Sequence, residues 1–158
     1  MKKIIICIIL WALVIGWMGF IFSMSAEPAA ESTETSGNTL RAIFNIIYPG
    51  FKNFDEAKQQ HIIEQNQYFI RKTAHFSVYT LLGILISLAM AQHIKKFSLI
   101  SYGIGTLYAI SDEIHQLYVP GRSGQISDVI LDSAGVALGC IIIFILYKLI
   151  IKKRANSI

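Results

Sequence analysis

The chain has 158 residues, of which 54% are hydrophobic and only 15% are charged. This composition excludes a soluble globular domain and places the protein in a lipid bilayer. The formal net charge of +4 does not indicate a nucleic-acid partner, because the basic residues lie beside apolar runs and not on a polar face interleaved with aromatic residues. We expect one membrane unit over residues 1–158 whose partners are membrane lipids.

The first predicted element is a membrane-spanning helix over residues 4–22. It follows Lys2 and Lys3 and precedes a Ser-Met-Ser-Ala sequence, so a cleaved secretory signal peptide is the alternative. An uncleaved helix is favoured, because the apolar run is longer than the roughly 7–15 residues of a signal-peptide core.

Residues 23–72 form the predicted outer loop. It opens with a polar run rich in small residues over 26–38, which is typical of a linker. Apolar residues then follow the i, i+3, i+4, i+7 spacing of an amphipathic helix, with Asn38 or Thr39 as its cap and Pro49 and Gly50 as its stop; they are Leu40, Ile43, Phe44 and Ile47. We expect this helix to lie on the outer leaflet or to roof the bundle.

Three more membrane helices are predicted, over residues 73–91, 97–118 and 129–151. A helix that starts near Asn53, with Asp55 and Glu56 in its first turn, is expected to run directly into the first of them. The predicted fold class is an all-α integral membrane protein with four transmembrane helices and an outer amphipathic helical loop.

The basic residues predict the orientation, because lysine and arginine accumulate on cytoplasmic flanks. With the N-terminus inside, the inner flanks carry bases without any acid, and all ten acids fall outside. The inner bases are Lys2, Lys3, Lys95, Lys96, Lys148, Lys152, Lys153 and Arg154. Both termini are therefore predicted to be cytoplasmic.

The two cysteines, Cys7 and Cys140, lie inside apolar runs without another Cys or His at ligand spacing. We therefore expect them to be small buried hydrophobic residues, and we expect no metal and no cofactor.

Three helices are predicted to carry polar faces at their outer ends, at 100° per residue. In chain order the faces hold Arg71, Lys72, His75 and Tyr79; Asp112, Glu113, His115 and Gln116; and Asp128 and Asp132. Gly135 and Gly139 continue the last face as a small-xxx-small pattern, which favours a neighbouring helix over lipid. Asp112 should lie about 12 Å below Pro120 if its helix reaches that proline.

The stretch from Pro120 to Gly124 is predicted to be a tight turn. Pro120 fixes one dihedral angle, and Gly121 and Gly124 permit positive φ. The turn would hold Arg122 and Ser123 over the polar faces, where a guanidinium and backbone amides together suit a phosphate or a carboxylate.

A purely structural alternative is a salt-bridge lock, in which the bases Arg71, Lys72 and Arg122 neutralise the acids of the three faces. Two observations count against it. Asp112 and Glu113 lie near the C-terminal end of their helix, where the helix dipole disfavours negative charge. The acids, which are Asp112, Glu113, Asp128 and Asp132, also outnumber the bases.

These motifs resemble the VanZ-like family. The resemblance rests on Arg-Lys-Thr-Ala-His-Phe at 71–76 with Tyr79, Ser-Asp-Glu-Ile-His-Gln at 111–116, Pro-Gly-Arg at 120–122, Asp128 and Asp132. Ser23, Ser25 and Pro28 after the first helix are similar too, although Glu27 stands where the family often has glutamine and Asp132 where asparagine is frequent. The resemblance implies a multi-pass protein of the bacterial cytoplasmic membrane. The family's name-giving member is associated with resistance to the glycopeptide teicoplanin.

The favoured function is binding of an amphiphile at the outer leaflet: a lipid-linked cell-wall precursor, a phospholipid head group or a lipoglycopeptide. The bases would take an anionic group, and the carboxylates would take amines or sugar hydroxyls. The candidate ligand-binding residues are Arg71, Lys72, His75, Tyr79, Asp112, Glu113, His115, Gln116, Arg122, Ser123, Asp128 and Asp132.

The first alternative is an enzyme acting on a lipid-linked substrate, with His75 or His115 as general base or metal ligand and Asp112, Glu113, Asp128 or Asp132 as partner. The Asp-Glu-x-His sequence is not the His-Glu-x-x-His zinc signature, so a metal version has little support. A proton-coupled transporter or a flippase ranks last, because four helices without an internal repeat make a small pathway unless a dimer forms.

Overall fold

The computed structural model describes residues 1–91 and 96–155, and within these ranges every regular element is helical. The elements are α1 (Lys2–Ser25), α2 (Ala29–Ile47), the 3-10 helix η1 (Pro49–Asn53), α3 (Glu56–Met90), α4 (Phe97–Gln116) and α5 (Ile126–Ala155). The predicted all-α fold is confirmed. Lys95 of the predicted inner flank lies outside the described residues, as do the side chains of Lys2, Lys152 and Arg154.

Three of the described helices, α1, α3 and α5, are long and apolar enough to cross a membrane. The qualifying segments are Lys3–Ser25, Glu56–Met90 and Ile126–Ile150. Helix α4 is not among them, because its C-terminal half carries Asp112, Glu113 and other polar residues that lower its mean hydropathy. The structure therefore supports the prediction that this is a membrane protein, and the predicted span at α4 stays a prediction.

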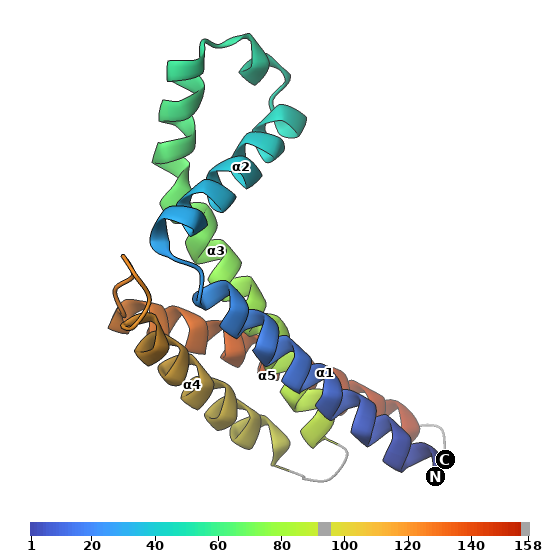
Figure 1. Cartoon of the computed structure of the whole chain (residues 1–158). Coiled ribbons are helices and arrows are strands. Elements are labelled where there is room, and N and C mark those ends of the chain that lie inside the picture. Colours follow the sequence, from blue (N-terminus) through green and yellow to red (C-terminus); the bar gives the residue numbers. More distant parts are fainter. Residues whose placement is uncertain (92–95, 156–158) are drawn as a thin grey trace.

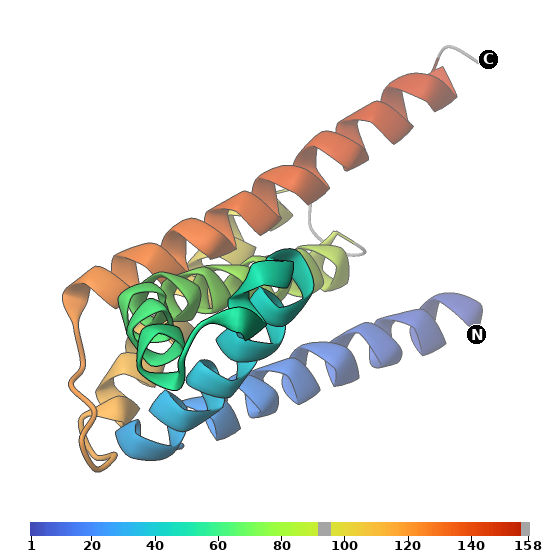
Figure 2. The same ribbon diagram turned by 90° about the horizontal axis from the view of Figure 1, so that it is seen from above.

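Helices α1, α4, α5 and the C-terminal half of α3 lie side by side as a bundle (Figures 1 and 2). Both termini lie at one end of this bundle, together with the end of α3 and the start of α4. The α1–α2 connection and the loop between α4 and α5 lie at the opposite end. Helix α3 packs against α1, α2, α4 and α5, so it is the central element of the fold.

The α3–α5 contact depends on glycine. A Cβ at Gly135 would lie 2.5 Å from the Phe76 carbonyl oxygen, and a Cβ at Gly139 would meet the Thr80 carbonyl oxygen. The two helix backbones are therefore in direct contact, which confirms that the glycine face of α5 is turned toward a neighbouring helix.

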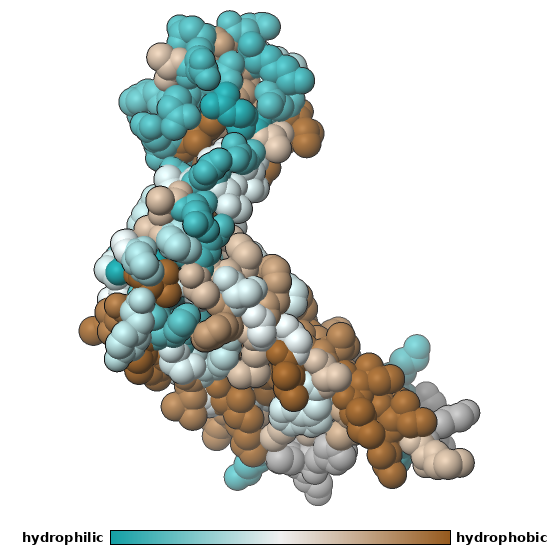
Figure 3. Space-filling view, in the orientation of Figure 1, coloured by the Kyte–Doolittle hydropathy of each residue, from teal (hydrophilic) through white to brown (hydrophobic). Residues whose placement is uncertain are grey.

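Helix α2 and the N-terminal half of α3 form a hairpin that projects from the bundle, with η1 at its tip (Figure 1). The hairpin has its own small core, in which Leu40, Phe51 and Ile63 are buried. On the face seen in Figure 3 most of the hairpin surface is hydrophilic, although Ile46, Ile47 and Phe69 are exposed apolar residues of the hairpin, and much of the bundle surface is hydrophobic. The predicted start of α3 is close to the observed one: Asp55 caps the helix and accepts a hydrogen bond from the Lys58 amide at 2.8 Å.

The prediction of a linker over 26–38 is wrong, because α2 already begins at Ala29 and neither Asn38 nor Thr39 caps it. Within the helix the Ser36 and Thr39 hydroxyls donate to the carbonyls of Ser32 and Thr35, so their polar side chains are hydrogen-bonded to the preceding turn. Gln67 of α3 also donates to the Ser36 hydroxyl at 2.8 Å. Tertiary contact thus overrides a composition typical of linkers.

Helix α2 lies along α3 and not across the other bundle helices, so the predicted roof is not formed. Its end before Pro49 agrees with the predicted stop. Ile47, assigned to the buried face, is 68% exposed, because α2 ends beside η1 and the buried contacts centre on Leu40. The predicted position on the outer leaflet stays a prediction.

Helix α4 ends at Gln116, well before Pro120. At 1.5 Å per residue Asp112 lies about 6 Å from the helix end and not about 12 Å below the proline. Asp112 is buried all the same, because α1 and α3 cover it and supply hydrogen-bond donors.

Candidate functional site

The loop between α4 and α5 contains the predicted tight turn. The Arg122 amide donates to the Val119 carbonyl at 3.1 Å, with Pro120 and Gly121 at the two central positions and Gly121 at a φ of 75°. Gly124 is needed for a different reason: a Cβ there would lie 2.6 Å from the Glu113 carbonyl oxygen. The expectation that both glycines supply positive φ therefore holds for Gly121 alone.

The side chain of Arg122 reaches from this turn to the end of α1. Its Nε donates to the Glu27 carbonyl at 3.1 Å, and its Nη2 donates to the Met24 carbonyl at 3.4 Å. Burial, and then repulsion from Arg71, lowers the pKa of Arg122. The guanidinium thus ties the turn to α1 through neutral acceptors.

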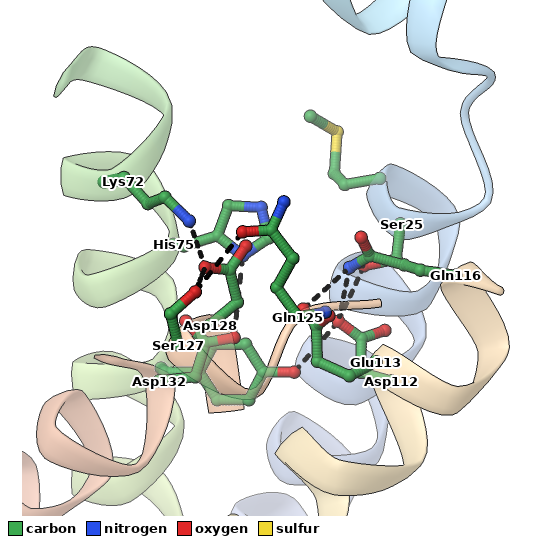
Figure 4. Close-up of polar contacts among 12 residues, drawn as sticks. Ser25, Lys72, His75, Asp112, Glu113, Gln116, Gln125, Ser127, Asp128 and Asp132 are labelled. Atoms are coloured by element: carbon green, nitrogen blue, oxygen red, sulfur yellow. Dashed lines mark hydrogen bonds and ion pairs between the residues drawn. The ribbon is translucent and has the colours of Figure 1, made fainter. Parts of the chain in front are cut away.

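Asp112 is the centre of a buried hydrogen-bond network at the end of the bundle opposite the termini (Figure 4). Its Oδ2 accepts from the Ser25 hydroxyl at 2.8 Å and from the Tyr79 hydroxyl at 3.1 Å. Gln116 lies one turn further along α4, and its Nε2 is 3.5 Å from the same oxygen. One carboxylate therefore joins α1, α3 and α4.

Glu113 joins α4 to the start of α5. Its Oε2 accepts from the Gln125 amide at 2.8 Å, and its Oε1 accepts from Gln116 Nε2 at 3.4 Å. Gln116 therefore lies between the two buried carboxylates, and the network continues to the first turn of α5 (Figure 4).

Two pairs connect the polar faces of α3 and α5. Lys72 forms an ion pair with Asp128, and His75 Nδ1 lies 3.6 Å from Asp132 Oδ2. Asp132 is completely buried, and neither of its oxygens has a hydrogen-bond partner among the described residues. His75 is the base closest to it, so the compensation of this carboxylate rests on His75.

Two cavities adjoin at the end of the bundle opposite the termini. We call the first the apolar groove; it has a volume of about 200 Å³ and lies between the end of α1, the first turns of α2 and the middle of α3. We call the second the polar pocket; it has a volume of about 350 Å³ and lies between α2, α3 and the α4–α5 loop. Arg71, His75 and Arg122 line both cavities.

The predicted site residues divide into three groups. Those lining a cavity are Arg71, Lys72, His75, Gln116, Arg122, Ser123 and Asp128. Those buried below the cavities are Tyr79, Asp112, Glu113 and Asp132. His115 does neither: its ring stacks on Phe22 of α1, with 4.3 Å between the ring centroids.

The salt-bridge lock, in which Arg71, Lys72 and Arg122 would all neutralise acids, is not formed. Only Lys72 pairs with a carboxylate, whereas Arg71 and Arg122 make no ion pair within residues 1–91 and 96–155. Those residues also contain no group of three or more His, Cys, Asp or Glu side chains that could hold a metal ion. The side chains that line the two cavities can bind an anion, form hydrogen bonds with a polar ligand and, through His75, exchange protons.

Several lining residues escaped the sequence analysis. Gln67 and Glu64 line the polar pocket, and each stands one or two helical turns before a predicted residue, Gln67 before Arg71 and Glu64 before Lys72. Extending the polar face of α3 in steps of four would have found both. Ser25 of the Asp112 network had a weaker signal, its place directly after an apolar run.

A family model described as VanZ/LLP1 matches residues 10–147. No curated protein and no solved structure matches the chain. The matched range includes part or all of each helix and every site residue described above. The chain therefore belongs to the VanZ-like family, as its three separated motifs had predicted.

Proposed function

We propose that this VanZ-like protein binds an amphiphile at the outer leaflet of the bacterial cytoplasmic membrane. The observation that carries the proposal is the shared wall of the two cavities: the apolar groove and the polar pocket adjoin at Arg71, His75 and Arg122. A molecule with a hydrocarbon part and a polar part matches such a pair of cavities.

The proposal includes four membrane spans. Helix α4 has 20 residues, which corresponds to about 30 Å, the thickness of a bilayer core. Leu99 and Leu107 of α4 are 72% and 68% exposed, and such side chains are stable against lipid. A fourth span is also consistent with both termini lying at one end of the bundle.

The orientation in the proposal places both termini in the cytoplasm. Lys3, Lys96 and Lys148 lie toward the end of the bundle that holds the termini, as expected of a cytoplasmic flank. The hydrophilic hairpin and the two cavities lie at the other end, which is then the outer face.

The ligand classes that fit are a lipid-linked cell-wall precursor, a phospholipid and a lipoglycopeptide such as teicoplanin. Each combines hydrocarbon with a charged or hydroxylated part, and the polar pocket offers Gln116, Ser123 and Asp128 as partners for such groups. If the ligand is teicoplanin or the precursor that it captures, the protein would contribute to glycopeptide resistance.

The test compares ligand retention by the wild type and by Ala74→Phe, which places a bulky ring in the apolar groove. Native mass spectrometry of the full chain, after incubation with lipid II, phosphatidylglycerol or teicoplanin, should show a bound amphiphile on the wild type and at least tenfold less on the variant. Ser77→Phe is the matched control, because Ser77 is exposed on the same helix and lines neither cavity. Equal retention by the wild type and Ala74→Phe, or none by the wild type, would refute the proposal.

One observation favours the alternative of an enzyme acting on a lipid-linked substrate. His75 borders both cavities while its Nδ1 faces Asp132, an arrangement in which a carboxylate orients an imidazole for proton transfer. In the incubations above, an enzyme would convert lipid II into a product of different mass, and His75→Gln would stop the conversion without preventing binding.

A further inference from the structure

We infer that Arg71 and Arg122 hold a lipid phosphate between them, with its hydrocarbon chain in the apolar groove and a polar substituent of the phosphate in the polar pocket. The inference rests on the proposed function and deepens it, because it names the ligand class and the orientation of the ligand. The order along the ligand, chain then phosphate then polar substituent, follows the order of the cavities around their shared wall.

The first step concerns charge. Lys72 also lines the polar pocket, but Asp128 neutralises it. Arg71 and Arg122 line both cavities and have no carboxylate partner within the described part of the chain. Two guanidinium groups that lack counter-charges thus stand where the cavities meet.

The nearby acid does not remove this excess. Glu27 lines the apolar groove, but its Oε1 accepts from the Thr35 hydroxyl at 3.0 Å and it makes no ion pair within residues 1–91 and 96–155. After burial, repulsion from Arg71 is the strongest influence lowering the pKa of Arg122, ahead of the opposing attractions of Glu27, Asp112 and Glu113. An anion between the two guanidiniums would relieve this repulsion.

The second step concerns the identity of the anion. The contacts of Arg122 with the Glu27 and Met24 carbonyls fix its guanidinium at the end of α1, and they use Nε and Nη2. Nη1 has no acceptor among the described residues and is available to a ligand. A phosphate presents several oxygens to two guanidiniums at once, which matches planar, forked donors better than a single carboxylate does.

The third step concerns the hydrocarbon chain. The wall of the apolar groove includes Phe20 and Ile21 of α1 and Ile70, Ala74 and Val78 of α3. These residues belong to two of the three helices that qualify as membrane spans, so the groove is lined by surfaces suited to acyl-chain contact. An apolar cavity of roughly 150 Å³ holds a benzene molecule, so about 200 Å³ holds a segment of one chain.

The fourth step concerns the polar substituent. The polar pocket is larger, at about 350 Å³, and its lining offers amides, a hydroxyl and carboxylates from Gln67, Gln116, Gln125, Ser123, Glu64 and Asp128. These groups donate and accept hydrogen bonds in several directions, as hydroxyls or amines beyond a phosphate require. A bare lipid phosphate would leave this pocket to water.

Trp17 makes the inference measurable. Its ring packs against Phe20 with 5.0 Å between ring centroids, and its Nε1 donates to the Val78 carbonyl at 2.9 Å; both neighbours line the apolar groove. The chain has two tryptophans, so Trp11→Phe leaves Trp17 as the sole fluorescent indole. A hydrocarbon chain that enters the apolar groove should change the fluorescence emission of Trp17.

The experiment titrates the Trp11→Phe protein, in micelles of a phosphate-free maltoside detergent, with four probes: dodecyl phosphate, dodecyl phosphoglycerol, dodecyl trimethylammonium and inorganic phosphate. We expect saturable emission changes with the two alkyl phosphates, tighter binding of the phosphoglycerol, and no saturable change with the cation or the free ion. Arg71→Gln should weaken binding of both alkyl phosphates at least tenfold. Since Arg71 makes no hydrogen bond or ion pair among the described residues, this variant should fold.

The matched control is Lys58→Gln, which removes one charge from the same helix within the hairpin, where Lys58 lies over the Phe54 ring. It should bind as the parent does. Equal binding of the cation and the phosphates, or of Arg71→Gln and the parent, would overturn the inference while amphiphile binding stands. An equal response to inorganic phosphate would overturn the placement of the chain, and failure of every alkyl probe would overturn both proposals.

Discussion

At the scale of single residues, the environment of Asp132 leads to a clear expectation. The carboxylate is completely buried, and His75 Nδ1, 3.6 Å away, is the closest base. A buried charge that loses its partner is costly, because nothing replaces the lost hydration.

We therefore expect His75→Ala to destabilise the protein by about 3 kcal/mol, a typical cost of breaking a buried pair. Thermal unfolding of the detergent-solubilised protein would measure the loss. Asp132→Asn in the His75→Ala background removes the charge at nearly constant shape and should recover most of the stability. Additive losses in the double variant would show that the two side chains do not compensate each other.

The sequence predicted which residues face one another better than it predicted their partners. Helical periodicity placed Lys72 and His75 on one polar face, and in the structure this face lies against Asp128 and Asp132. The salt-bridge alternative had Arg122 neutralising an acid, but Arg122 donates to the carbonyls of Glu27 and Met24. That outcome depends on where α1 ends relative to the loop, and helical periodicity carries no information on such long-range placement.

At the scale of elements, the contact between α3 and α5 positions both polar pairs. The contact depends on Gly135 and Gly139, which leave no room for a side chain against the α3 backbone. Larger residues there must move the helices apart, and the pairs of Lys72 and His75 lie on the same two helices.

Gly135→Leu should therefore lower the thermal unfolding temperature strongly, at a cost of about 3 kcal/mol or more, because overpacking at a backbone contact cannot be relieved by rotating a side chain. Gly103→Leu is a suitable comparison, since a Cβ at Gly103 has nothing within 4 Å. Equal effects of the two substitutions in the same unfolding assay would contradict a specific α3–α5 contact.

The elements were largely predictable, but their ends were not. Apolar runs predicted α1, α5 and the membrane part of α3, because length and hydropathy suffice for such helices. The early start of α2 and the end of α4 at Gln116 were missed. Both ends depend on contacts with other parts of the chain. Gln67 of α3 donates to Ser36 of α2, and Arg122 of the α4–α5 loop donates to the Glu27 carbonyl just after α1.

At the scale of the whole molecule, the proposed four-span topology makes a sharp prediction for cysteine accessibility. In a Cys7→Ala, Cys140→Ala background, Ser123→Cys should react with a membrane-impermeant maleimide in intact cells, because Ser123 lines the outward polar pocket. Lys96→Cys, at the start of α4, should react only after permeabilisation.

Labelling of both positions in intact cells would mean that α4 does not cross the membrane, and labelling of Lys96→Cys alone would mean the opposite orientation. A cysteine at Lys58, in the hydrophilic hairpin, is a positive control for the outer face in the proposed topology. The apolar helices of the bundle were expected from hydropathy, and the expected helix from near Asn53 into the next apolar segment is observed as α3. The packing of α2 on α3 was not expected, because it depends on a few apolar residues such as Phe51.

Helix α3 runs without a break for 35 residues, a length of about 52 Å. A bilayer core is about 30 Å thick, so in the proposed topology roughly two-fifths of this helix extends beyond the lipid. Arg71, Lys72 and His75 follow that extension on the same unbroken helix. In that topology a displacement of the hairpin tip would tilt these three side chains together.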